Sequence, residues 1–75
     1  MRLVGRVIHR TGRRLFVVHC DAAQLPRLYS EVTDRRLSPL GRIVDIFGKV
    51  EHTYAAVASY PGRTPETGVK VYARD

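Results

Sequence analysis

Residues 40–50 read LGRIVDIFGKV, an apolar and β-branched run with a glycine near each end. On a strand, alternation of period two places Ile43 and Phe47 on one face and Val44 and Ile46 on the other. A chain of 75 residues can bury only one face of such a strand in its own core and has little material for a second layer. The second apolar face therefore predicts a surface for a partner protein. The alternative is a strand that is buried on both sides.

The rest of the chain is divided into short apolar segments by turn residues. Strands are expected at residues 3–9, 15–19, 31–33, 40–50, 54–58 and 69–72. Residues 21–29 are expected to form a loop held by Pro26, in which residues 22–25 could form a single helical turn. Six short strands at this spacing are typical of a small barrel or sandwich. The sequence therefore predicts one all-β domain over residues 1–75, a small six-stranded antiparallel barrel.

The charge balance is strongly basic, with 13 Lys and Arg residues against 7 Asp and Glu residues and a formal net charge of +6. Such a balance favours nucleic acid, or the surface of a nucleic-acid complex, as a binding partner. Cys20 is the only cysteine, which excludes a disulfide within the chain and fits a reducing interior. The N-terminal residues do not resemble a signal peptide, and no apolar run reaches membrane-spanning length. We therefore expect a soluble, intracellular protein.

Residues that could carry catalysis or hold a metal are scattered. The three histidines, His9, His19 and His52, lie far apart in the sequence without ligand-like spacing. His19 and its neighbour Cys20 should point to opposite faces of one strand. Asp45 has no second carboxylate or nucleophile near it in the sequence, and no glycine-rich phosphate loop is present. We expect no catalytic residue, no metal, no cofactor and no small-molecule substrate.

Five arginines lie at two expected turns: Arg10, Arg13 and Arg14 around the first hairpin, and Arg35 and Arg36 after the third strand. They are candidate RNA-proximal residues, because arginine contacts to phosphate give salt-dependent affinity. The few aromatic residues are not interleaved with these arginines, so the stacking platform of single-strand binders is missing. The alternative is that the charges keep exposed turns soluble and protect sheet edges. We expect weak electrostatic attraction to RNA at most.

Several segments of the chain together form a pattern that is known from one family. They are residues 3–9, Pro26, and residues 32–37, 41–50, 54–58 and 68–72. In order and spacing they resemble the archaeal GAR-type subunit of the H/ACA guide-RNA pseudouridylation ribonucleoprotein. The most specific element is Val-Asp-Ile-Phe-Gly, which follows a glycine and precedes an aromatic strand. The chain departs from the family at Lys49 and Thr53, where proline is usual and frequent, respectively.

The resemblance implies a six-stranded barrel of the reductase, isomerase and elongation-factor type that docks on a dyskerin-type pseudouridine synthase. Such a subunit is not an enzyme and makes little direct RNA contact. It steadies the thumb loop of the synthase and so assists the loading and release of rRNA substrate, with the guide RNA present through the complex. The implied location is the archaeal cytoplasm. The residues implied in docking are Pro26, Leu28, Ile46, Phe47, Gly48, Val50 and Tyr54.

Two other interpretations remain open. A PRC-type barrel shares a strand in which a glycine precedes an aspartate, here Gly41 and Asp45, and would act as an adaptor in another assembly. That interpretation does not account for the continuation through Phe47, Gly48 and Tyr54. A direct RNA-binding barrel of the translation-factor type would instead use the arginines at the turns.

Overall fold

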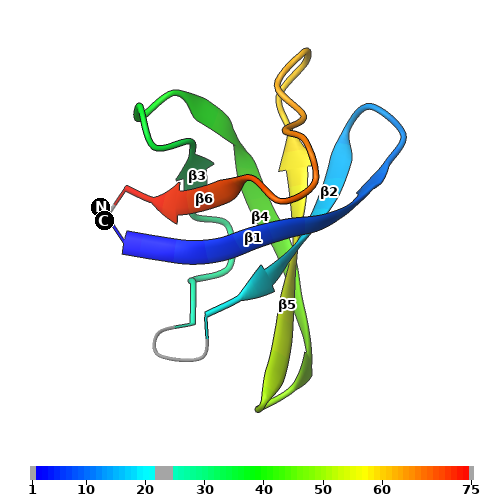
Figure 1. Cartoon of the computed structure of the whole chain (residues 1–75), viewed down its shortest axis with the longest axis vertical. Helices are drawn as coiled ribbons and strands as arrows, with labels where there is room; N and C mark the ends of the chain where they lie inside the picture. Colours follow the sequence, from blue (N-terminus) through cyan, green and yellow to red (C-terminus); the bar gives the residue numbers. More distant parts are fainter. Residues whose placement is uncertain (1, 22–24, 75) are drawn as a thin grey trace.

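The chain forms six β-strands in a computed structural model, which describes residues 2–21 and 25–74 (Figure 1). The described residues contain no helix. The strands are β1 (Arg2–Thr11), β2 (Leu15–Cys20), β3 (Glu31–Thr33), β4 (Pro39–Lys49), β5 (His52–Ser59) and β6 (Lys70–Ala73). Each strand found lies where the sequence predicts one, with ends that differ by zero to two residues.

The strands close into a barrel in the order β1-β2-β5-β4-β3-β6, and every neighbouring pair is antiparallel. Closure depends on the long strand β1, which pairs with β2 on one side and with β6 on the other. Gly5, for example, lies opposite Cys20 of β2 and Val71 of β6. Figure 1 shows β1 crossing the front of the molecule between these two strands. The predicted six-stranded antiparallel barrel is confirmed.

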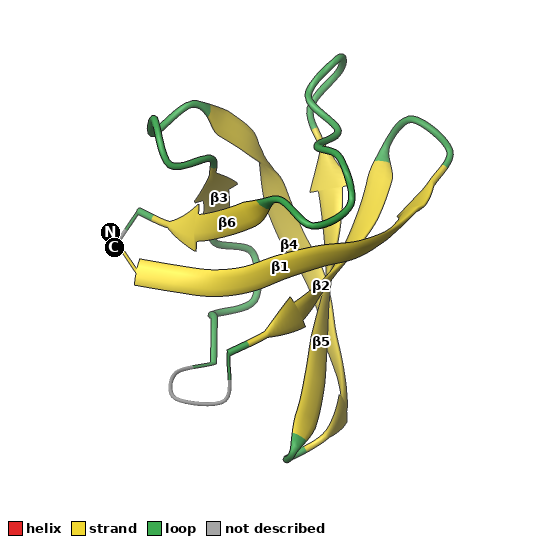
Figure 2. Ribbon diagram, viewed as in Figure 1, coloured by secondary structure: helices red, strands yellow, loops and turns green. Residues whose placement is uncertain are grey.

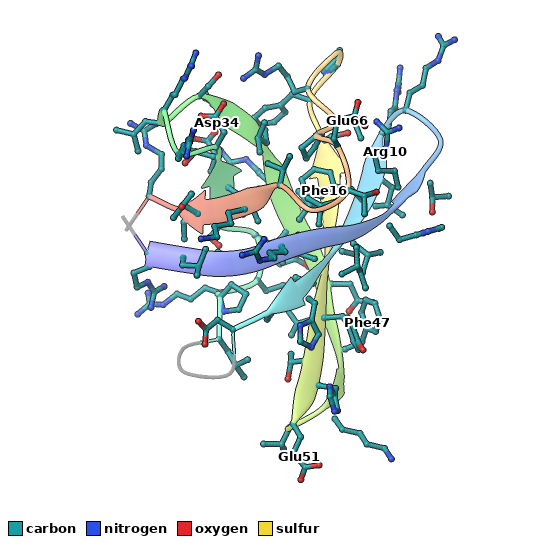
Figure 3. The ribbon with its side chains drawn as sticks, viewed as in Figure 1. Arg10, Phe16, Asp34, Phe47, Glu51 and Glu66 are labelled. Carbon is teal, nitrogen blue, oxygen red and sulfur yellow. The ribbon has the colours of Figure 1, made fainter. Side chains whose placement is uncertain are left out.

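Every strand contributes buried side chains to the core. In β2, β5 and β6 these are alternate residues, as expected when one face of a strand is buried, whereas register shifts interrupt the alternation in β1, β3 and β4. Its largest fully buried side chains are Phe16, Ile43, Val7, Val18, Val32, Val57, Val71 and Thr33. Phe16 is the one aromatic ring among them and lies near the centre of the barrel in Figure 3. The other members of the hydrophobic core are aliphatic residues and Cys20, and they fill a barrel of this size.

A β-bulge in β4 changes which residues of that strand face the core. Ile43 pairs with Val57 of β5, whereas Asp45 pairs with Ala56, so Val44 is the extra residue between them. After the bulge the alternation is reversed, and Ile46 packs against the same core as Ile43. The predicted faces, Ile43 with Phe47 and Val44 with Ile46, are therefore wrong, because the period-two reading did not include the bulge.

The hairpin formed by β4 and β5 extends beyond the rest of the barrel (Figure 2). Its last pair is Lys49 with His52, and Val50 and Glu51 form the turn. The helical turn considered for residues 22–25 falls mostly on residues 22–24, which lie outside the described ranges. In those ranges no helix is long and apolar enough to cross a membrane.

Candidate functional site

Three rings lie side by side across the outer surface of β2, β5 and β4, and we call His19, Tyr54 and Phe47 the aromatic row. Tyr54 of β5 is the direct cross-strand neighbour of His19 on β2 and of Phe47 on β4. The ring centroids of His19 and Tyr54 are 5.2 Å apart, and those of Phe47 and Tyr54 are 5.7 Å apart with an interplanar angle of 25°. These distances are typical of aromatic pairs that stabilise each other.

The alternation of β5 explains why the aromatic row lies outside the barrel. Ala55 and Val57 are fully buried, so Tyr54 and Ala56, which alternate with them, point outward. The residues beside Ala56 on the outer face are Val17 of β2 and Asp45 of β4. Phe47 is 44% exposed, and the bulged residue Val44 is 42% exposed. The outer face of the sheet therefore carries apolar surface that the barrel itself does not cover.

The tip of the hairpin continues this face. Val50 is 90% exposed, and the backbone turns at Gly48, whose φ is +102°. A Cβ atom on Gly48 would collide with the carbonyl oxygen of His52 and would touch the ring of Tyr54. Only glycine combines this φ with so close an approach of the opposite strand. Gly48 thus holds the end of the hairpin next to the aromatic row.

Lys49 and Thr53, the two positions where the chain departs from the family pattern, are linked by a hydrogen bond. The Thr53 hydroxyl donates to the carbonyl oxygen of Lys49, with 2.9 Å between the oxygens. Thr53 is buried, so this bond also satisfies a polar group that is shielded from water. A side-chain hydrogen bond therefore fastens this turn without proline.

The structure brings together four of the seven predicted docking residues: Phe47, Gly48, Val50 and Tyr54, all on the β4–β5 hairpin. Ile46 is half-buried and packs against the core, so it belongs to the inner face. The structure thus resolves which of the neighbours Ile46 and Phe47 points outward.

The other two predicted docking residues lie in the loop before β3. Pro26 is buried, so it presents little surface on the barrel. Leu28 is 46% exposed. Its loop runs beside β4, because the amide of Tyr29 donates to the carbonyl of Ile43 and the amide of Ile43 donates to the carbonyl of Ser30. Leu28 is therefore available at the edge of the same sheet.

Sequence reasoning missed His19, the third member of the aromatic row. Its opposite orientation to the buried Cys20 was predicted correctly, but its position beside Tyr54 follows only from the pairing of β2 with β5. His19 also borders a hollow of about 340 Å³ between β1 and the hairpin tip, whose lining includes Leu3 and Ile8. Both of these apolar side chains are exposed. The aromatic row thus adjoins a second apolar area on β1.

The five candidate RNA-proximal arginines do not lie together. Arg10 and Arg13 border an open concavity beside Gly62 and Thr64, and Arg10 lies 3.8 Å from the carboxylate of Glu66. Arg35 and Arg36 line a different cleft with Arg6 and Lys70. Figure 3 shows Arg10 and Asp34, which mark the two regions, on opposite sides of the upper part of the barrel. Two separate basic surfaces therefore exist.

The histidines, Cys20 and Asp45 are the residues whose chemistry was considered from the sequence. The rings of His19 and His52, which are distant in sequence, have centroids 5.9 Å apart. In the described ranges, no three His, Cys, Asp or Glu side chains are grouped so as to hold a metal ion. Burial raises the pKa of the Cys20 thiol, which favours its protonated and unreactive form. Asp45 is exposed on the outer face of β4.

No protein-family model matches this chain, and no curated protein matches its sequence significantly.

Proposed function

We propose that this protein is a non-catalytic subunit of an H/ACA guide-RNA ribonucleoprotein and binds a dyskerin-type pseudouridine synthase through the aromatic row and the hairpin tip. The observation that carries the proposal is the stacked pair of Phe47, which is exposed, and Tyr54, which is half-buried, on the outside of a barrel that has a complete core of its own. The sequence pattern of the GAR-type subunit includes both residues. The rest of that pattern supplies the identity of the partner.

The chemistry of the face is suited to a protein partner. Aromatic side chains bury large areas at low conformational cost and are frequent among the residues that dominate binding energy. Ala56 and Ala58 of β5 also point outward, and their small side chains let a partner approach the sheet closely between Val17 and Arg42. Val50 at the tip of the hairpin and Leu28 in the loop beside β4 are exposed apolar residues that could add to this contact.

A docking subunit of this kind acts by changing the populations of its partner's conformations. If the barrel binds one conformation of the synthase thumb loop more tightly than another, that conformation becomes more populated. The loading and release of rRNA substrate then depend on the barrel, although it supplies no catalytic group. The family resemblance places this action in the archaeal cytoplasm during ribosome biogenesis.

Affinity capture tests the proposal. The tagged protein is expressed in its own cells and purified with and without nuclease treatment, beside a bait that carries Phe47→Glu. We expect a dyskerin-type synthase in stoichiometric amount, retained after nuclease and lost with Phe47→Glu. Capture of RNA alone would instead favour a direct RNA-binding barrel. Stoichiometric capture of an unrelated protein would favour an adaptor of the PRC type.

A further inference from the structure

A basic cleft of about 490 Å³ lies between β1, the turn from β3 to β4, and β6. Its residue Arg6 is the cross-strand neighbour of His19, so the cleft adjoins the aromatic row at β1. We call it the basic cleft; its lining includes Arg6, Arg35, Arg36, Lys70, Tyr72 and Asp34. The cations come from three segments that are distant in the sequence. Figure 3 shows Asp34 at its turn, well separated from Phe47.

The turn that carries Arg35 and Arg36 is held by its own hydrogen bonds. The Asp34 carboxylate accepts the backbone N–H of Arg36 at 2.8 Å and that of Ser38 at 3.0 Å. The amide of Asp34 donates to the carbonyl of Ser38, and the amide of Leu37 donates to the carbonyl of Asp34. Because the backbone is fixed in this way, a ligand would not need to order the turn before binding.

Arg6 and Lys70 are direct cross-strand neighbours in the pairing of β1 with β6, and both are exposed. Like charges in this position destabilise a sheet. The loop before β6 holds Lys70 there, because Val7 donates to the carbonyl of Val69 and accepts from the amide of Gly68. An anion in the cleft would relieve this repulsion.

Within residues 2–21 and 25–74, no side-chain hydrogen bond is made by any of these four cations, whereas three other arginines of the barrel do have such partners. Arg42 donates to the carbonyl of Tyr29, Arg63 donates to the carbonyl of Pro39, and Arg74 lies 3.4 Å from the carboxylate of Glu31. In the described part of the chain, by contrast, no ion pair joins any of the four cleft cations to a carboxylate. The charges of Arg6, Arg35 and Lys70 are therefore available to a ligand, whereas the charge of Arg36 also interacts with the Asp34 carboxylate and helps to lower its pKa.

We propose that the basic cleft binds the phosphodiester backbone of a single-stranded nucleic acid. Three of its four cations are arginines, whose planar guanidinium matches phosphate oxygens in pairs. The half-buried ring of Tyr72 lies in the same cleft and offers a surface for a base. The sequence did not reveal this, because Tyr72 is far from Arg35 and Arg36 along the chain and joins them only when the barrel closes.

Fluorescence polarisation of a labelled twelve-nucleotide RNA, and of a DNA of the same sequence, tests the proposal at 50–200 mM salt. The variant Arg35→Gln with Arg36→Gln removes two cleft charges. Its matched control, Arg13→Gln with Arg14→Gln, removes the same charge from the first hairpin turn. We expect the cleft variant to lose affinity about tenfold and to lower the slope of log affinity against log salt by about 1.4, since each single-strand phosphate contact contributes about 0.7. The control should change affinity by no more than about twofold.

Equal losses in the two variants would show attraction by net charge alone and overturn the proposal. Tighter binding of a polyglutamate peptide than of either oligonucleotide would overturn it in favour of an acidic protein. Equal binding of RNA and DNA supports recognition of phosphate alone, and tighter binding of RNA adds a contact to the 2′-hydroxyl. Both of these results agree with the proposal.

Lys70→Glu gives a second readout that a purely structural role would not produce. It replaces a repulsive cross-strand pair with an attractive one, so the midpoint of thermal unfolding should rise by about 2–4 °C. The same variant should bind the oligonucleotide at least tenfold more weakly, because it brings a carboxylate to the phosphate site. A variant that is stabilised and still binds with unchanged affinity would contradict the proposal.

Discussion

Phe47 on β4 and Tyr54 on β5 face each other across the strands and stack with ring centroids 5.7 Å apart, on the outside of the barrel. Their immediate neighbours Ile46 and Ala55 are also paired with each other, and Ala55 is fully buried. Two adjacent cross-strand pairs of the hairpin therefore have different roles: Ile46 and Ala55 pack in the core, whereas Phe47 and Tyr54 lie on the outer face. This contrast makes the two roles separable by mutation.

Ile46→Glu should destabilise the barrel, and Phe47→Glu should leave it folded. Glutamate at position 46 would place an unpaired charge against the core, at a cost of roughly 3 kcal/mol. At position 47 the loss is limited to one exposed cross-strand aromatic pair, about 0.5–1 kcal/mol. Urea unfolding followed by circular dichroism measures both values. Equal destabilisation by the two substitutions would contradict the opposite orientations of Ile46 and Phe47 that follow from the bulge at Val44.

Gly48→Val should cost more stability than Gly62→Val, although both glycines have positive φ. A side chain at position 62 would meet open space, so only the backbone conformation is unfavourable there, by about 1–2 kcal/mol. At position 48 the side chain would also strike the carbonyl of His52, and we expect roughly 3 kcal/mol or more. Thermal unfolding of the two variants is the measurement. If Gly48→Val lost less stability than Gly62→Val, the close approach of Gly48 to the carbonyl of His52 would be refuted.

Asp34 gives the stability of the barrel a defined dependence on pH. The hydrogen bond from the Ser38 amide, with that from Arg36, holds the pKa of this carboxyl below its ordinary value of 3.8. Because the folded-state pKa is depressed, the stabilisation is present above pH 3.8 and is lost as the pH falls through the lower folded-state value.

Asp34→Ala should therefore reduce stability at pH 7 by about 1 kcal/mol, through loss of the two hydrogen bonds to the turn backbone. The loss should become progressively smaller as the solution is acidified below pH 4. Asp34→Asn is the control, because an amide oxygen can still accept a hydrogen bond but does not titrate. Urea unfolding between pH 2 and pH 7 measures the difference in unfolding free energy between wild type and each variant. A constant difference between wild type and Asp34→Ala across this range would show that the carboxylate does not stabilise the turn.

Protein purified without added metal should contain no stoichiometric zinc. His19 and His52 are neighbours in the structure, but the described residues provide no third ligand beside them, and zinc sites use at least three protein ligands. Inductively coupled plasma mass spectrometry of the purified protein measures the metal content directly. One zinc ion per chain would contradict this prediction and would indicate that His19 is a metal ligand rather than only a member of the aromatic row.

Strand positions could be predicted from the sequence because β-branched runs and turn residues are local signals. The segments 15–19 and 31–33, for example, lie within β2 and at β3. The orientation of Phe47 could not be predicted in the same way. The bulge at Val44 depends on how β4 pairs with β5, and a single extra residue exchanges the two faces of everything that follows.

The hairpin proposed for docking could be predicted from residues that are consecutive or nearly so, whereas His19 and the basic cleft depend on contacts across the barrel. His19 joins Tyr54 through the pairing of β2 with β5. Arg6 meets Lys70 only where β6 closes the barrel against β1. Without related sequences to reveal such pairs, a single chain carries no local signal for them.

The most direct test of the proposed docking function is a calorimetric titration of the purified dyskerin-type synthase from the same organism. Phe47→Glu is compared with wild type and with Leu37→Glu, which introduces the same charge at an exposed apolar residue on the turn before β4. We expect wild type and Leu37→Glu to bind equally, and Phe47→Glu to bind about 30-fold more weakly, as for a central hot spot. No binding by wild type, or wild-type affinity in folded Phe47→Glu, would contradict the assignment of the aromatic row as the docking face.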